Sequence, residues 1–133
     1  MAKVRFKGFG GVFLSAVATG SEDDPSVLLV HGAGQTRAVW TEVAEALVRA
    51  GRRVITLELR GHGESDWPSD GNYAFDAMVE DFRSVLAQLD SRPVIVAAKL
   101  GGWIATVGLS KHASLLAAGL VLVDMPTRSD SPA

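Results

Sequence analysis

A lysine stands where a predicted strand passes almost directly into a predicted helix. Residues 94–98 form a continuous apolar run, which is typical of a buried parallel strand. A helical pattern starts near Leu100, and besides Lys99 only the glycines Gly101 and Gly102 mark the change. The turn between the two elements must therefore be very sharp, with the amine of Lys99 at its apex.

An amine in this position could do chemistry. The N-terminus of a helix opposes a positive charge, and partial burial would disfavour the ammonium form further. A neutral amine facing backbone N–H groups can form a Schiff base with a carbonyl compound. Alternatively, the side chain of Lys99 reaches solvent and has no role.

Other polar or glycine-rich segments follow predicted strands. They are His31-Gly32-Ala33-Gly34, Arg60–Ser65 and Asp124. Ligands of open α/β sheets bind beyond the carboxyl ends of the strands, where these segments would converge with Lys99. We therefore expect a site for a small-molecule ligand at this edge of the sheet.

Several side chains near this edge are better explained by structure than by catalysis. His31 and His62 are expected to order their loops by hydrogen bonds, and His112 to face solvent. Trp40, Trp103 and Met78 are expected in the core or in the wall of a pocket. Glu58 is unusual within an apolar strand and would pair with Arg52 or Arg53, or point toward an edge.

The periodicity of apolar residues predicts the elements that position these groups. Strands are expected at Lys3–Lys7, Val12–Thr19, Ser26–Val30, Val54–Leu59, Val94–Ala98 and Gly119–Val123, the last of them buried. A helix is expected at Arg37–Ala50, with Thr36 as its N-cap and Gly51 just past its end. A second helix is expected at Tyr73–Leu89, with Asp81 on its polar face. A third is expected at Leu100–Leu109, followed by a helical turn within Ser110–Gly119.

This order of elements predicts an α/β fold. Strands that alternate with helices form a three-layer, mostly parallel sheet with helices on both faces and right-handed crossovers. Neither a linker nor an internal repeat divides the chain, so residues 1–133 form one domain, with frayed residues at Met125–Ala133.

Composition excludes some classes of function. The net charge of −2 mixes both signs, so no basic surface for nucleic acid or anionic lipid is expected. The absence of cysteine excludes disulfides and fits the cytoplasm, and no cofactor or metal is expected. No apolar run is long enough for a membrane helix. The alternation of Val4 and Phe6 with basic residues favours an N-terminal β-hairpin over a secretion signal.

Taken together, the motifs resemble the N-terminal part of the α/β-hydrolase superfamily over residues 12–126. The matching segments are His31–Gly34, Arg60–Ser65, the turn Ala97–Gly102 and the strand end Val121–Asp124. The resemblance implies a sheet order of 1-2-4-3-5-6 and a nucleophile elbow at Lys99. It also implies that the backbone N–H groups of Ala33 and Leu100 form an oxyanion hole, with His31, Gly32, Gly34 and Trp103 lining the pocket.

The chain also departs from the family pattern. The elbow of the family is Gly-x-Ser-x-Gly, whereas this chain has Ala97 in place of the first glycine and Lys99 in place of the serine. Asp124 would end the strand beside that of Lys99 and lie within reach of it, as an ion-pair partner or as a catalytic acid. The usual late catalytic histidine is not expected in a fold truncated after its sixth strand.

Three functions remain open at this stage. The chain could be an α/β-hydrolase-like protein that keeps an oxyanion-type pocket but lacks a complete Ser-His-acid triad, with Lys99 as the mark of a lost nucleophile. It could use Lys99 as a Schiff-base catalyst. It could also be an assembly module that forms a homodimer, or pairs with a complementary chain, through an exposed sheet edge.

Overall fold

Six strands form a single mixed sheet in a computed structural model of the protein, which describes residues 1–111 and 113–124. The strands are β1 (Ala2–Lys7), β2 (Phe13–Thr19), β3 (Ser26–Val30), β4 (Arg53–Leu57), β5 (Val94–Ala98) and β6 (Gly119–Val123). Their order is β1-β2-β4-β3-β5-β6, with β4, β3, β5 and β6 parallel and β1 and β2 antiparallel to their neighbours. The predicted fold class and sheet order are confirmed.

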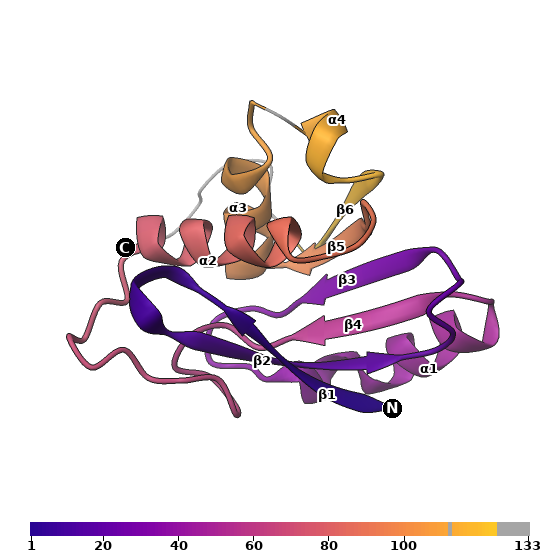
Figure 1. The fold of residues 1–133 in the computed structure, drawn as a ribbon, viewed down its shortest axis with the longest axis horizontal. Coiled ribbons are helices and arrows are strands. Elements are labelled where there is room, and N and C mark those ends of the chain that lie inside the picture. Colours follow the sequence, from indigo (N-terminus) through magenta and orange to yellow (C-terminus); the bar gives the residue numbers. More distant parts are fainter. Residues whose placement is uncertain (112, 125–133) are drawn as a thin grey trace.

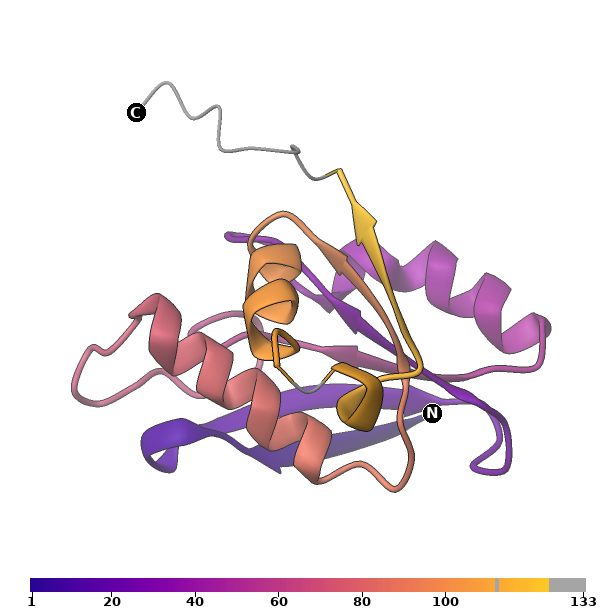
Figure 2. The ribbon, with the colours of Figure 1, turned by 90° about the horizontal axis from the view of Figure 1, so that it is seen from above.

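Helices cover both faces of this sheet (Figures 1 and 2). The α-helices are α1 (Thr41–Arg49), α2 (Phe75–Ala87), α3 (Leu100–Gly108) and α4 (Ala113–Leu116), and the 3₁₀ segments are η1 (Phe9–Gly11) and η2 (Arg37–Trp40). α1 lies on one face of the sheet, and α2 and α3 lie on the other.

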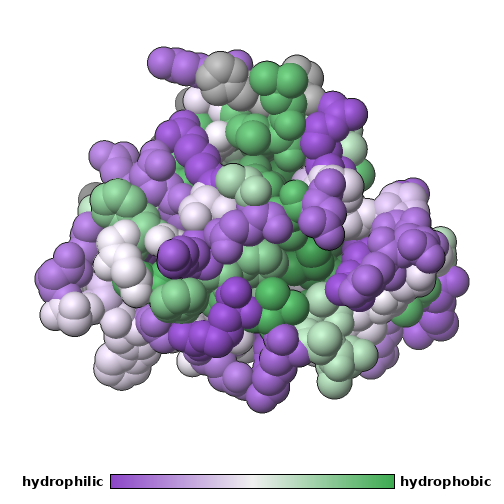
Figure 3. All heavy atoms as spheres, in the orientation of Figure 1, coloured by the Kyte–Doolittle hydropathy of each residue, from purple (hydrophilic) through white to green (hydrophobic). Residues whose placement is uncertain are grey.

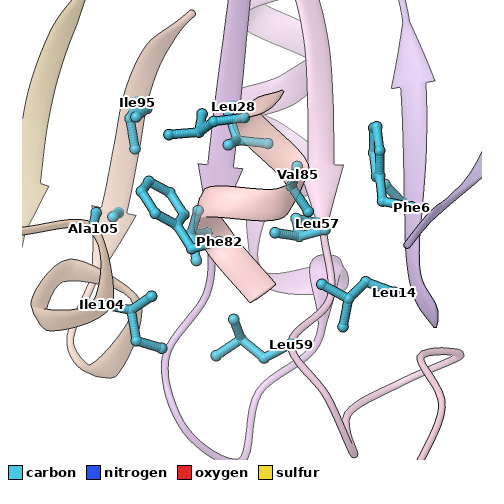
Figure 4. Packing of buried hydrophobic residues seen from close by; sticks show 14 of the residues in the cluster. Phe6, Leu14, Leu28, Leu57, Leu59, Phe82, Val85, Ile95, Ile104 and Ala105 are labelled. Carbon is cyan, nitrogen blue, oxygen red and sulfur yellow. The ribbon is translucent and has the colours of Figure 1, made fainter. Parts of the chain in front are cut away.

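Two hydrophobic cores fill the space between the layers. The larger one joins the sheet to α2 and α3, and its centre contains Leu28, Leu57 and Phe82, which are almost fully buried (Figure 4). The smaller one lies under α1 and contains Trp40 and Val54. Burying these side chains is the main favourable contribution to folding, because each removes apolar surface from water.

The N-terminal hairpin forms as predicted. β1 and β2 pair in antiparallel register from Ala2 opposite Ala18 to Lys7 opposite Phe13. The turn between them passes through Gly10 and Gly11, whose φ angles of 69° and 81° suit glycine.

The helix predicted after β3 is split. Its N-cap is confirmed, because the side chain of Thr36 accepts a hydrogen bond from the N–H of Ala38. However, the chain first forms η2 and only then α1. Gly51 follows the end of α1 with φ +85°, and the N–H of Arg52 reaches back to the carbonyl of Leu47 to close the last turn.

The expectation that β6 is buried is wrong. Its four large residues, Leu120 to Val123, are 37–49% exposed, because β6 pairs only with β5 and, among the described residues, no long helix lies over it. In Figure 3 hydrophobic residues also gather in the upper part of the molecule, where α4 lies in Figure 1.

In the part of the chain that the structure describes, no helix is long and apolar enough to cross a membrane. His112 and Met125–Ala133, for which exposure and fraying are predicted, lie outside the described residues.

Candidate functional site

The predicted elbow is present at the junction of β5 and α3. Lys99 has φ 51° and ψ −122°, a conformation that residues with a side chain rarely adopt. Its carbonyl already accepts a hydrogen bond from the N–H of Trp103, so the helix begins immediately after it. Gly101 lets α3 approach β3, because a Cβ there would overlap the carbonyl oxygens of Val30 and His31.

The lysine at the apex is exposed and paired with a carboxylate. Its Nζ lies 3.8 Å from Oδ2 of Asp124, and the two side chains are 54% and 75% exposed. The parallel register of β5 and β6, with Ala98 opposite Val123, brings the two residues together. Of the two alternatives for Asp124, the structure thus shows the contact of an ion pair, and the side chain of Lys99 is half exposed, with its stem close to Gly32.

Two backbone N–H groups beside the elbow have no hydrogen-bond partner within the described residues. They belong to Ala33 and Leu100, the pair predicted as oxyanion donors. By contrast, the N–H of Gly32 donates to Oε1 of Gln35 at 2.9 Å, and that of Gly34 donates to Nε2 of His62 at 2.9 Å. The turn that follows β3 is thus tied at both glycines, and the N–H between them stays available.

Two histidines fix the loops after β3 and β4 to each other. Nε2 of His31 accepts a hydrogen bond from the N–H of Leu59 at 3.0 Å, and Nε2 of His62 accepts from Gly34 in the opposite direction. Each ring must therefore donate through Nδ1, His31 to the carbonyl of Gly32 and His62 to that of Arg60. The structural role predicted for both histidines is confirmed.

Burial holds His31 in its neutral form. The side chain is fully buried, and desolvation lowers the pKa of the imidazole below its usual value of 6.5, with a smaller opposing effect from the hydrogen bond to Gly32. Protonation would also remove the acceptor that Leu59 needs. His31 is therefore a poor proton carrier at neutral pH and a good structural link.

Glu58 is a buried anchor for the same loops. Its carboxylate accepts hydrogen bonds from the N–H groups of Arg37 and Glu64, and its Oε1 lies 3.7 Å from Nε of Arg37. Pairing with Arg52 or Arg53 is therefore wrong. Gly63 leaves the space that this carboxylate occupies, since a Cβ at that position would overlap it.

A buried ion pair that the sequence analysis missed supports the loop after β4. Arg60 and Asp81 are 1% and 2% exposed, and the guanidinium donates from Nε and from Nη2 to the two carboxylate oxygens at 2.7 and 2.8 Å. These hydrogen bonds raise the pKa of Arg60. Asp81 also accepts from the N–H of Phe9, so α2, the hairpin turn and the loop meet at one point.

The prediction that Asp81 lies on the polar face of its helix is wrong, because the side chain is buried. A signal was available in its spacing, because Asp81 stands three residues after Met78 and four before Val85, both buried on the core side of the helix. The three residues expected in the core or in the wall of a pocket differ in burial. Trp40 and Met78 are buried, whereas Trp103 is 39% exposed on α3.

Within residues 1–111 and 113–124, no group of three or more candidate metal ligands lies together. The chemistry that the described geometry offers is therefore that of one exposed amine, its carboxylate partner and two available backbone donors.

Known proteins share this arrangement of elements. The alpha/beta hydrolase fold family model matches residues 25–132. An esterase of Mycobacterium tuberculosis is 35% identical over 102 residues, covering 76% of this chain and 33% of the esterase. A mouse sn-1-specific diacylglycerol lipase is 33% identical over 110 residues, covering 81% of this chain and 35% of the lipase.

Solved structures agree on the fold. The crystal structure of an epoxide hydrolase from Vigna radiata superposes with a TM-score of 0.85 at 21% identity, covering 98% of this chain and 42% of the hydrolase. The chain spans about a third of the length of the esterase and the lipase. The family match, the sheet order and the strained elbow agree, and the chain belongs to the alpha/beta hydrolase fold family.

Proposed function

We propose that this chain is an α/β-hydrolase-fold protein that retains an oxyanion-type backbone site but does not by itself hydrolyse esters through a serine nucleophile. The observation that carries the proposal is the residue at the apex of the elbow. Lys99 occupies the strained position from which a nucleophile would be presented, and it has no hydroxyl group.

The surroundings of Lys99 support a loss of ester hydrolysis. Its partner is the carboxylate of Asp124, and an ammonium ion paired with a carboxylate has no lone pair with which to attack a carbonyl. Direct acyl transfer to an amine would in any case leave an amide, which is far harder to hydrolyse than an ester. The backbone donors of Ala33 and Leu100 do not depend on the side chain at the apex and can persist without it.

Hydrolysis of p-nitrophenyl acetate by the purified full chain tests this proposal. We expect the rate with the wild-type protein to equal that with Lys99→Ala, since both lack the nucleophile. A steady turnover that Lys99→Ala abolishes would contradict the proposal. In Lys99→Ser we also expect no burst of p-nitrophenolate, because both ring nitrogens of His31 and of His62 are already hydrogen-bonded and neither can take the proton of the new hydroxyl.

Of the two features that would favour a Schiff base at Lys99, a helix N-terminus and burial of the amine, the structure shows the first. The N-terminus of α3 lies beside the amine, but the side chain of Lys99 is half exposed rather than desolvated. Borohydride reduction in the presence of a panel of ketones and aldehydes, followed by intact mass and peptide mapping, distinguishes the two functions. A Lys99 adduct that forms faster than adducts at other exposed lysines would favour the amine catalyst, and its absence across the panel would exclude it.

Assembly through the sheet edge is a second candidate, favoured by the exposure of β6. The strand is apolar on both faces and carries neither charge nor proline, the features that usually protect an edge from pairing. Antiparallel pairing of two copies of β6 about Val121 would place Asp124 opposite Ala118 of the other copy rather than opposite a second carboxylate.

Light scattering over a range of concentrations tests the assembly. We expect a homodimer in the wild-type protein and a monomer in Val121→Lys, because a buried unpaired ammonium would oppose pairing. The matched control is Val107→Lys, at a valine of α3 that is 39% exposed and whose carbonyl accepts a hydrogen bond from Arg83 of α2. A wild-type protein that stays monomeric at the highest concentration would contradict the candidate.

A further inference from the structure

The loops after β3 and β4 are joined by two hydrogen bonds of the same kind that lie in different surroundings. In each, Nε2 of a histidine accepts from a backbone N–H of the other loop, at 3.0 Å for Leu59 and His31 and at 2.9 Å for Gly34 and His62. The first bond is buried, because Leu59 and His31 are 2% and 0% exposed. The second lies at the surface, since Gly34 is exposed and His62 is only half-buried.

Each of these bonds exists only while its histidine ring is neutral. Both rings already donate through Nδ1 to a carbonyl, so Nε2 is the acceptor of each ring, and a second proton would turn it into a donor that faces another donor. The charge of a histidine ordinarily changes between about pH 5 and 8. Burial lowers the pKa of His31, whereas solvent reaches the ring of His62.

The bond to His62 holds the turn that carries the N–H of Ala33. Within this turn the N–H of Gln35 donates to the carbonyl of Gly32 at 3.2 Å, which closes the turn on itself without fixing it to its neighbours. The bond from Gly34 to His62 ties the far end of the turn to the loop after β4. Without that bond, the direction of the Ala33 N–H relative to the elbow is no longer fixed.

The charged groups around His62 leave its ring free to take up a proton. The titratable side chains around it come from the ends of β3 and β4, from η2 and from the segment before α2, and they are His31, Glu58, Arg60, Glu64, Arg37 and Tyr73. The ring of His31, whose centroid lies 5.0 Å away, is neutral. Each nearby cation is paired with a carboxylate, Arg37 and Lys3 with Glu58 and Glu64, Arg60 with Asp81, and Lys99 with Asp124. Among the described residues, no unbalanced positive charge therefore opposes the imidazolium form of His62.

We propose that His62 is a pH-sensitive latch on the oxyanion-type site, whereas His31 is a permanent link. At neutral pH the latch holds Gly34 and, with it, the N–H of Ala33. When His62 takes up a proton, its bond to Gly34 is lost, and the turn separates from the loop after β4. The N–H groups of Ala33 and Leu100 then no longer point to one oxygen. This regulation rests on the oxyanion-type site proposed above, but the latch is a hydrogen bond that can be observed without any substrate.

Scalar coupling across the two N–H···N hydrogen bonds tests the latch in the uniformly ¹⁵N-labelled full chain. At neutral pH we expect one coupling between the backbone nitrogen of Gly34 and Nε2 of His62, and another between that of Leu59 and Nε2 of His31. As the pH falls to about 5, the Gly34 coupling should disappear while the Leu59 coupling is still present. A Gly34 coupling that is absent at neutral pH or persists at about pH 5, or a Leu59 coupling that is lost first, would overturn the proposal. None of these outcomes depends on whether the chain hydrolyses an ester.

Two variants of His62 connect the latch to Ala33. His62→Gln offers an amide oxygen that can accept from Gly34 at every pH, whereas His62→Ala offers no acceptor. In the wild-type protein the amide shifts of Gly34 and Ala33 should follow one titration curve, with the midpoint of the His62 ring. In folded His62→Gln they should not follow it, and in folded His62→Ala they should resemble the acid form of the wild type already at neutral pH. Shifts that titrate in His62→Gln as they do in the wild type would refute the latch.

Discussion

The loops that follow β3 and β4 and the turn that follows β5 lie at the same edge of the sheet, yet they are built in opposite ways. The first two are held by buried polar groups, among them His31, Glu58 and Arg60, each at most 2% exposed. The turn after β5 presents Lys99, whose side chain is 54% exposed and, among the described residues, has one ion-pair partner.

The difference distinguishes the buried residues that hold the loops in place from Lys99, the residue at the position of a nucleophile. Each buried group satisfies backbone N–H or C=O groups of a neighbouring loop, so its removal leaves unpaired polar atoms in the interior. By contrast, the side-chain nitrogen of Lys99 has, among the described residues, only the exposed carboxylate of Asp124 as partner, and its backbone is strained. Substitutions in the first region should therefore destabilise the protein, whereas substitutions of Lys99 should not.

The largest effect is expected from breaking the buried ion pair. Asp81→Ala leaves the guanidinium of Arg60 buried without its counter-charge, and we expect a loss of about 3–5 kcal/mol in the free energy of unfolding. Urea denaturation measures this loss. Glu80→Ala is the control, because Glu80 forms an exposed ion pair with Arg83 and should cost less than about 1 kcal/mol. Equal effects of the two variants would contradict the distinction between the regions.

The second effect comes from closing the space beside Glu58. Gly63→Ala adds a methyl group that overlaps the buried carboxylate, at a residue with φ +51°, and we expect a loss of about 3 kcal/mol in the free energy of unfolding. Gly71→Ala has a similar φ of +70° with nothing within 4 Å, so it should lose only about 1 kcal/mol. The difference between the two variants isolates the contribution of the packing around Glu58.

Acid should weaken the first region through His31. The pKa of His31 is lower in the folded protein than its unfolded value of 6.5, so the unfolded state binds the additional proton. This contribution to stability is fully present above pH 6.5 and is lost as the pH falls toward the folded pKa. The free energy of unfolding should therefore decrease in this window, which denaturation at a series of pH values would show.

A variant identifies the group responsible for that decrease. His31→Gln should be less stable at neutral pH but should lack this part of the pH dependence. The pKa of Asp66 is lowered by hydrogen bonds from the N–H of Phe13 and from Arg5. The contribution of Asp66 to stability is therefore lost only below pH 3.8, outside the window in which His31 titrates. A His31→Gln protein with the same slope between pH 5 and 6.5 as the wild type would show that another group titrates there.

The elements that sequence could predict are those specified by local pattern. The apolar runs predicted all six strands, and the sharp junction at Lys99 predicted the elbow and, with Asp124, the ion pair. The partners of buried charges could not be predicted, because Arg60 and Asp81 are separated by 21 positions along the chain. The exposure of β6 was missed for a related reason, since an apolar strand indicates suitability for burial without specifying what covers it.

The smallest expected effect is the change in the free energy of unfolding of Lys99→Gly, and its sign is the most informative. Lys99→Gly should relieve the strain at φ 51°, ψ −122°, which typically costs about 1–3 kcal/mol, while losing an exposed ion pair worth about 1 kcal/mol or less. Measuring the free energy of unfolding tests directly whether the position of Lys99 at the elbow serves to present its side chain rather than to stabilise the fold. We predict that it rises by about 1 kcal/mol in Lys99→Gly, and a decrease would contradict the account.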